Sequence, residues 1–430
     1  MSEVSLLKRV QDAVAGSAAA FRSRVTLQPA GGEGDKVFPP TYSGAVYATE
    51  KRQVANRSEP GTFKLVECVL LDSVQSQANR IEEALQDAVD EKRISIPVIE
   101  VDFSEIPVVE PGQNAEGLFE PIGRVTSLEA PHRVADAILR DSEDQNGVAF
   151  RETPAGKKIG FANLRNATPL FEICPTALLL GLWDSTGPKG GLGTKFQRAL
   201  VSEIIGVDAS YGTKTSSRID PLAIRKDAAL IYQTPNRGWT LSPAEAAQDK
   251  KKPILKGKDG KPSEANHGNI VPSLSDVSRD GQPLAGGVTI AFAEQMTVIS
   301  LPALRRLQFP IDGKVSAEVN NAGRTVLAAL GLCGAVLAAD RGLDLRSRCL
   351  LWPTAPLTWE LLDRPGSKSE PFELDAATAI KLLADAIQLA KDAGLPWMDL
   401  PMKLKPAKKL VELVRKSQEL AILSGEGGES

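Results

Sequence analysis

Histidine, cysteine and aromatic residues are scarce in this 430-residue chain, and each shortage excludes a class of chemistry. Only two histidines, His132 and His267, are present, and neither belongs to an HxxxH or HD pair, so zinc or two-metal hydrolysis lacks ligands. No GxSxG elbow occurs, which argues against a serine hydrolase. Aromatic residues make up 5% of the chain, too few for base recognition by extensive stacking. We therefore expect no metal and no cofactor.

The four cysteines, Cys68, Cys174, Cys333 and Cys349, are isolated in apolar surroundings, and we interpret them as buried thiols. No run of eighteen apolar residues is present, and the N-terminus lacks the basic-then-apolar order of a signal peptide. We expect a cytoplasmic protein without a membrane partner. The apolar content of 42% indicates a globular chain, with room for two or three domains or for one domain with large insertions.

The formal net charge is −3, so a site for a polyanion has to be local. Basic residues gather in three places: the stretch from Lys189 to Arg225, the loop from Lys250 to Lys261, and the tail from Lys403 to Lys416. Solvated surface is the interpretation that we favour for the tail. For the lysine-rich loop, solvated surface and anion binding both stay open.

The stretch from Trp183 to Pro221 is the most informative part of the chain. Gly190, Gly191 and Gly193 precede the sequence Thr194-Lys195-Phe196-Gln197, which fits a capping box and predicts a helix from residue 194 to about 205. Glycines let a ligand approach the backbone, and the N-terminus of a helix attracts negative charge. An anion site is expected here.

A Walker phosphate loop is excluded in this stretch. Phe196 follows Lys195 at the position where a hydroxyl group should bind Mg²⁺. A plain structural turn is the alternative for any isolated cluster of glycines, and the neighbouring Lys189, Lys195 and Arg198 favour the anion site over that alternative.

Two segments of the chain each predict a β-α-β unit. The first has strands at 63–71 and 96–103 around a helix that begins at Ser73. The second has strands at 288–300 and 345–352 around a helix at 318–339. Two such units predict an α+β fold with a ferredoxin-like (RRM-like) sheet, in which the helices cover one face and the other face stays free.

Five regions follow from this division: an N-terminal helix (5–20) and irregular segment in 1–62, the first half of the sheet in 63–109, an insertion in 110–286, the second half in 287–353, and a C-terminal extension in 354–430. The extension predicts a strand at 358–362, helices at 376–393 and 406–423, and disorder from 424.

The insertion predicts a helix at 132–140 and a polar segment at 243–287. The polar segment has too few apolar residues to fold by itself, so we expect a flexible basic loop, or an arm that orders on a partner.

Polar residues crowd the first turns of the helix that begins at Ser73, among them Gln77, Asn79 and Arg80. Their amide and guanidinium groups can bind ribose or phosphate oxygens, although helix capping and solvation are the alternative for each one alone. Ser217 and Arg218 repeat the combination at a turn, where Asp220 is expected to orient Arg218.

Four segments carry a resemblance to a known family: residues 73–82 (SVQSQANRIE), 132–142 (HRVADAILRDS), 174–206 (CPTALLLGLWDSTGPKGGLGTKFQRALVSEIIG) and 216–224 (SSRIDPLAI). From about residue 39 to 352 the chain resembles the Csb-one proteins, which are Cas-seven-type backbone subunits of type I-G (formerly I-U) CRISPR systems in the RAMP superfamily. The combination WDSTG, GGLG and KFQRALVSEI is the specific part of the match.

The resemblance implies an RRM-like palm with finger and thumb insertions, and a non-catalytic subunit that polymerises along the guide RNA of a Cascade complex for antiviral defence. The implied partners are the CRISPR RNA, target DNA through guide pairing, further copies of the chain, and other Cascade subunits, namely a Cas-five/Cas-six-like subunit and a large subunit. The RNA contacts that it implies are Gln77, Asn79, Arg80, Lys189, Gly190, Gly191, Lys195, Arg198, Ser217 and Arg218.

The chain also departs from an ordinary RRM, because it has no RNP aromatic motif. The alternative function is a metal-dependent RNA-cleaving or nucleotide-binding enzyme that uses the glycine-rich loop. Asp184 and Asp220 are the acidic residues nearest the basic stretch, and no sequence feature marks either one as a nuclease residue.

Overall fold

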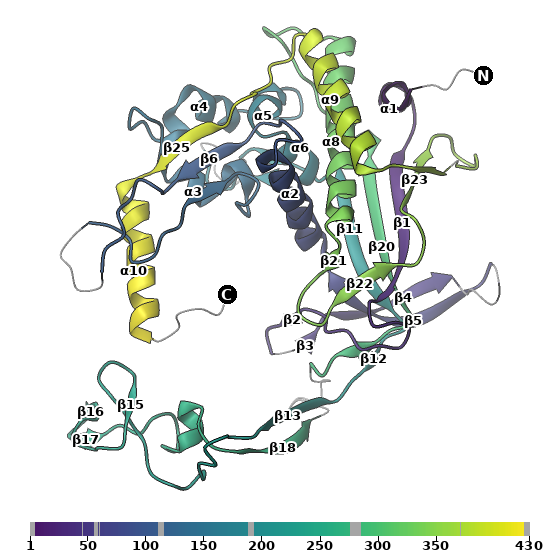
Figure 1. The fold of residues 1–430 in the computed structure, drawn as a ribbon. Coiled ribbons are helices and arrows are strands. Elements are labelled where there is room, and N and C mark those ends of the chain that lie inside the picture. The colour runs from purple at the N-terminus through teal and green to yellow at the C-terminus, as the bar shows by residue number, and fades with distance from the viewer. Residues whose placement is uncertain are drawn as a thin grey trace.

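The computed structural model describes residues 5–44, 46–55, 59, 61–110, 116–187, 193–275, 285–369 and 371–424, which form a mixed α+β fold with ten α-helices (Figure 1). The main sheet is antiparallel and has nine strands: β1 (Ala20–Pro29), β4 (Thr49–Ala55), β5 (Phe63–Asp72), β11 (Leu200–Val207), β20 (Phe292–Ser300), β21 (Leu343–Asp344), β22 (Leu350–Pro353), β23 (Thr358–Leu362) and β24 (Pro371–Glu373). Their order is β21-β22-β1-β20-β11-β5-β4, and β23 joins β24 to β1.

Side-chain alternation gives this sheet two different faces. Phe21, Leu200 and Ile299 are buried at neighbouring positions of β1, β11 and β20, in one core with the helices α2 (Val74–Asp90) and α8 (Ala317–Asp340). On the opposite face Arg22 and Arg24 point away from that core and form ion pairs with Glu360 and Glu294. Along β1 this matches the expectation of one helix-covered face and one free face, whereas on β11 the opposite face buries Ile205 and Val207 in a small apolar cluster.

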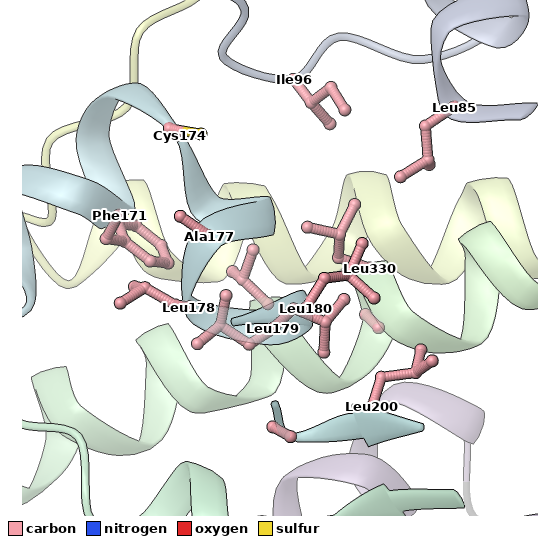
Figure 2. Close-up of a cluster of buried hydrophobic side chains, with 14 of the residues drawn as sticks. Leu85, Ile96, Phe171, Cys174, Ala177, Leu178, Leu179, Leu180, Leu200 and Leu330 are labelled. Carbon is pink, nitrogen blue, oxygen red and sulfur yellow. The ribbon is translucent and has the colours of Figure 1, made fainter. Parts of the chain in front are cut away.

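The centre of the core lies between α8, α2 and two short helices, α5 (Thr168–Ile173) and α6 (Pro175–Leu180) (Figure 2). Leu178, Leu179 and Leu180 of α6 pack there with Leu330 of α8 and Leu200 of β11. Among the described residues, α8 is the one helix long and apolar enough to cross a membrane, but 78% of its 18-residue apolar window is buried in the protein. Its apolar character is therefore explained by packing.

All four cysteines are buried and free, which confirms their interpretation as buried thiols. Burial raises the pKa of the Cys333 thiol to about 12, so this group stays protonated at neutral pH.

A second sheet corrects the first predicted β-α-β unit. The strand β6 (Ile99–Asp102) does not join β5 in the main sheet; it lies between β7 (Arg124–Thr126) and β25 (Met402–Pro406), and β25 also pairs with β8 (Ser142–Glu143). The β-α-β assignment of 63–103 is therefore wrong. The main sheet is completed instead by β1, which lies within the region predicted as helix and irregular chain, and by β11, which lies within the predicted insertion.

Three predicted helices are confirmed with shifted ends, as α1 (Leu6–Ala15), α9 (Ala376–Asp392) and α10 (Lys408–Ser424), and the strand predicted at 358–362 is confirmed as β23. The strand expected at 288–300 is divided into β19 (Val288–Thr289) and β20. Of the strand expected at 345–352, only 350–352 form a strand, in β22, and 345–349 connect β22 to β21 in a hairpin. The helix expected at 132–140 is divided into η1 (Arg133–Ala135) and α3 (Ala137–Arg140). Residues 425–430, for which disorder is predicted, lie outside the described part of the chain.

An arm, defined here as residues 214–275, projects from the body of the molecule (Figure 1). Its stalk is a ribbon of β13 (Lys214–Arg218) and β18 (Ile270–Ser275), and its lobe holds the hairpins β14 (Tyr232–Gln233) with β15 (Trp239–Thr240) and β16 (Gln248–Asp249) with β17 (Lys252–Pro253). The described part of 243–287 is thus not a structureless loop. Ile231, which precedes that segment, is buried, lines a pocket of the same lobe together with Pro262, and supplies apolar surface that the segment lacks alone.

The remaining short elements link these parts: β2 (Thr41–Tyr42), β3 (Val46–Tyr47), η2 (Phe150–Glu152), α4 (Pro154–Gly160), β12 (Ser210–Tyr211), η4 (Pro262–Ala265) and α7 (Leu301–Arg305).

Candidate nucleic-acid interface

The helix predicted from residue 194 to about 205 is wrong, because this segment forms two strands. The first is β10 (Lys195–Phe196), which pairs with β9 (Leu182–Trp183), and the second is β11 of the main sheet. Phe196, Leu200 and Ile204 are buried, and their spacing of four residues fits one face of a strand as well as one face of a helix. The hydroxyl of Thr194 caps no helix; it donates to carbonyl oxygens at the end of α4, including that of Ile159 at 3.2 Å.

The strands β9 and β10 form a hairpin, and two of the predicted RNA contacts lie exposed in it or next to it. Lys195 and Arg198 are both exposed, and neither forms an ion pair within the described residues. The Nζ of Lys195 lies 5.3 Å from the centre of the Trp183 ring. Residues 188–192, which include the predicted contacts Lys189, Gly190 and Gly191, are outside the described residues.

A buried ion pair fixes the entry to the hairpin. Arg133 donates from Nε and Nη2 to the two carboxylate oxygens of Glu82, at 2.6 and 2.7 Å, and from Nη1 to the carbonyl oxygen of Gly181 at 3.0 Å. Burial raises the pKa of Glu82 to about 7, against the opposing effect of the Arg133 charge. Helix α2 is thereby connected through Arg133 to the residue that precedes β9.

The same carboxylate faces a second guanidinium group. Burial and then the charge of Arg133 lower the pKa of Arg198, while the charge of Glu82 acts in the opposite direction. The charge of one carboxylate therefore acts on two guanidinium groups, and both oxygens of Glu82 accept hydrogen bonds from Arg133. The result is a local excess of positive charge around Arg198, which favours an anionic ligand.

Asp184 fixes the far side of the same hairpin. Its carboxylate accepts a hydrogen bond from Arg151 at 2.8 Å and one from the backbone N–H of Thr186 at 3.2 Å. Its own backbone N–H donates to the carbonyl oxygen of Thr194 at 2.9 Å. Asp184 thus acts as a structural residue of the turn that follows β9.

The three contacts predicted at the start of α2 have different environments. Gln77 is buried, and its Nε2 donates to Asp72 at 2.6 Å while its Oε1 accepts from Ser202 at 2.9 Å and from Gln295 at 2.8 Å. Arg80 donates from Nε to Asp72 at 3.0 Å and from Nη2 to the carbonyl oxygen of Leu345 at 2.6 Å.

Gln77 therefore has its amide group bound to protein partners and is almost fully buried, and Arg80 is held against the fold. Asn79 is exposed to solvent.

Ser217 and Arg218 lie elsewhere, on β13 in the stalk of the arm, with Ser217 exposed and Arg218 half-buried. The hairpin of β9 and β10 comes before β11 in the chain, and the arm comes after it. The length of β11 therefore separates Lys195 and Arg198 from Ser217 and Arg218. Asp220 does not orient Arg218. Its carboxylate accepts the backbone N–H groups of Leu222 at 3.0 Å and Gly268 at 2.6 Å, and so closes the base of the lobe.

The charges of the molecule are distributed unevenly. The arm contains eleven Lys and Arg residues against six Asp and Glu residues, a net charge of +5, so the remainder of the chain carries −8. In the tail, Lys405, Lys408 and Lys409 form ion pairs with Glu105, Glu116 and Asp141. These three tail lysines are thus neutralised by acidic partners in the protein, whereas the arm has more basic than acidic residues.

The described residues contain no group of three or more His, Cys, Asp or Glu side chains that could hold a metal ion. Asp184 and Asp220, the acidic residues considered for a nuclease, lie on separate elements and bind protein groups. The sequence alone did not indicate either structural role, because both depend on contacts with distant residues.

Comparison with known proteins connects part of the chain to a family of known description. Residues 21–211 match the family model of CRISPR-associated protein GSU0053 (Cas_GSU0053). The matched range begins in β1, includes the hairpin of β9 and β10, and ends after β11. A search of curated proteins found no match. The family match supports a CRISPR-associated role for the chain.

Proposed function

We propose that this chain is a non-catalytic backbone subunit that binds CRISPR RNA in a type I-G Cascade complex, a cytoplasmic assembly for antiviral defence. Its partners would be the guide RNA, target DNA paired to that RNA, further copies of the chain, and the other Cascade subunits. The observation that carries the proposal is the pair of exposed cations without ion-pair partners among the described residues, Lys195 and Arg198, in a chain that matches a CRISPR-associated family.

The order of strands in the main sheet supports an RRM-like palm. Along the chain, β1, α2, β11, β20, α8 and β22 follow one another as β-α-β-β-α-β. In the sheet their order is β22-β1-β20-β11, so the fourth strand lies beside the first, then the third, then the second. This order agrees with the one expected for a ferredoxin-like sheet, and β5 and β4 continue the sheet beyond β11.

The position of the arm supports its assignment as the thumb of that palm. It is inserted between the second and third strands of the ferredoxin-like unit, β11 and β20. Its net charge of +5 suits contact with a phosphate backbone, and the acidic remainder of the chain suits contact with the basic arm of a neighbouring copy. The basic arm of one copy can therefore lie against the acidic remainder of the next, so neighbouring copies along one RNA strand need not repel each other.

The salt dependence of RNA binding tests the proposal. The variant Lys195→Gln/Arg198→Gln removes both exposed cations without reversing the charge beside Glu82. For single strands, each phosphate that a cation neutralises contributes about 0.7 to the slope of log K against log salt, so removal of two cations should decrease the slope by about 1.4.

Lys381→Gln provides the matched control, because this lysine is 75% exposed on α9, where no RNA contact is proposed. It should leave the slope unchanged. A double variant that binds guide RNA with the affinity and the slope of the unmodified chain would remove the proposed contacts.

A further inference from the structure

Trp183 presents a large aromatic ring to solvent beside a cation. It occupies the second position of β9, directly opposite Lys195 in the pairing with β10, and its side chain is 58% exposed. The ammonium group of Lys195 lies 5.3 Å from the ring centre, within the range of a cation–π interaction. More than half of this tryptophan thus stays in water, although the transfer of an aromatic ring out of water is favourable.

The support under Trp183 is rigid. The adjacent residues Leu182 and Phe196 are both buried in the core, on the opposite side of the two strands. The two ends of the hairpin are fixed by the bond from Arg133 to the carbonyl oxygen of Gly181 and by the bond from the N–H of Asp184 to the carbonyl oxygen of Thr194. A ligand that stacks on the ring would therefore meet a surface already in place, with little entropy lost on binding.

A second cation lies near Lys195, across a pocket that Trp183 itself does not line. A shallow pocket of about 230 Å³ adjoins the hairpin, and its lining includes Lys195, Gln197 and Arg306. Arg306 is exposed and, like Arg198, forms no ion pair within the described residues. An exposed ring next to uncompensated cations matches the sites that bind single-stranded nucleic acid, where bases stack and cations bind the backbone.

We propose that Trp183 is a stacking platform for one unpaired nucleobase of the bound strand, and that Lys195 and Arg306 bind the phosphates on either side. This inference rests on the proposed function, which supplies the single-stranded RNA. Stacking uses the face of a base and not its edge, so the platform accepts any base. A single platform is compatible with the low aromatic content of the chain.

Binding of a fluorescein-labelled polyuridine oligonucleotide to the purified chain, followed by fluorescence anisotropy, tests the platform. Loss of one stacked base corresponds to about 1–3 kcal/mol, so Trp183→Ala should weaken binding about 5- to 150-fold. Trp183→Phe should restore most of the affinity. The slope of log K against log salt should stay unchanged in both variants, because both keep every cation that binds a phosphate.

Trp352→Ala is the matched control, because Trp352 is also an exposed tryptophan, at 66%, but lies on β22. It should change the affinity less than about twofold. A second readout uses the unmodified chain: a 5-iodouridine oligonucleotide should crosslink to Trp183 on irradiation.

The outcomes separate this inference from the proposed function. An unmodified chain that binds no RNA overturns both. An unmodified chain that binds RNA, together with a Trp183→Ala variant of equal affinity or a crosslink that avoids Trp183, overturns only the platform. A Trp183→Ala variant that binds RNA normally but no longer assembles with partner subunits would identify a protein-docking surface and would also overturn the platform.

Discussion

Replacement of Asp72 by alanine would test whether the start of α2 is a structural network. Asp72 is the last residue of β5 and its side chain is fully buried. Its carboxylate accepts hydrogen bonds from Gln77 at 2.6 Å, from Arg80 at 3.0 Å and from Arg346 at 3.3 Å. The three donors come from α2 and from the chain between β21 and β22, so one carboxylate joins both parts of the fold.

The magnitude follows from the exposure of the two guanidinium groups. Removal of one partner from a buried ion pair costs roughly 3–5 kcal/mol. The side chains of Arg80 and Arg346 remain 28% and 27% exposed, so water replaces part of the lost interaction and the lower end of the range applies. The amide of Gln77, which is buried, loses its acceptor at a cost of about 1 kcal/mol. We expect Asp72→Ala to lower the free energy of unfolding by about 3–4 kcal/mol.

Urea unfolding followed by far-UV circular dichroism measures this loss as a lower midpoint at an unchanged m value. Asp12→Ala is the control, because it breaks an exposed ion pair with Lys8 and should cost less than about 1 kcal/mol. If Asp72→Ala costs no more than Asp12→Ala, the network does not stabilise the fold as argued. A Gln77→Ala variant that weakens RNA binding at an unchanged urea midpoint would likewise contradict the interior position of Gln77.

Three further predictions concern other parts of the fold. Burial raises the pKa of Glu82 from 4.5 to about 7 on folding, so the folded chain retains a proton that the unfolded chain loses, and stability should fall as the pH rises through this window. Glu82→Gln should remove that fall from a profile of melting temperature against pH, and superimposable profiles would refute the assignment. Leu404→Ala, at a buried position of β25 beside β6, should lower the free energy of unfolding in urea by about 2–4 kcal/mol, whereas a loss below about 0.5 kcal/mol would show that β25 is dispensable. Gly206→Ala should lower the melting temperature, because its Cβ would lie 2.7 Å from Ile290 Cγ2 and 3.0 Å from Val69 Cγ1; a stabilised variant would contradict the close packing of β11.

The elements that could be predicted are those in which several local features agree. The helix α2 has a serine cap and a buried face with helical spacing. The apolar sequence of α8 is too long for a typical strand, so a buried helix is the structure that it predicts. The strand β1 also alternates buried residues such as Phe21 and Val25 with arginines, but the pattern lies within a segment assigned to helix and irregular chain. The strand β11 was misassigned because a spacing of four residues fits both periods.

The sheet to which β6 belongs could not be predicted from local sequence. It pairs with β25, about three hundred residues further along the chain, and no local pattern indicates so distant a partner. The same limit applies to the candidate site. The exposure of Lys195 agrees with the pattern of alternation in β10, whereas the burial of Gln77 depends on Ser202 and Gln295, which come from two distant strands.

The RNA carried by the assembled complex provides the most direct test of the proposed function. The chain would be expressed with a CRISPR array and its partner subunits, purified, and treated with ribonuclease before the bound RNA is sequenced. A guide-binding backbone subunit predicts RNA of uniform length, with protected segments that repeat at a constant interval and in a fixed ratio to the number of copies. RNA of random length, or purified complex without RNA, would contradict the proposal.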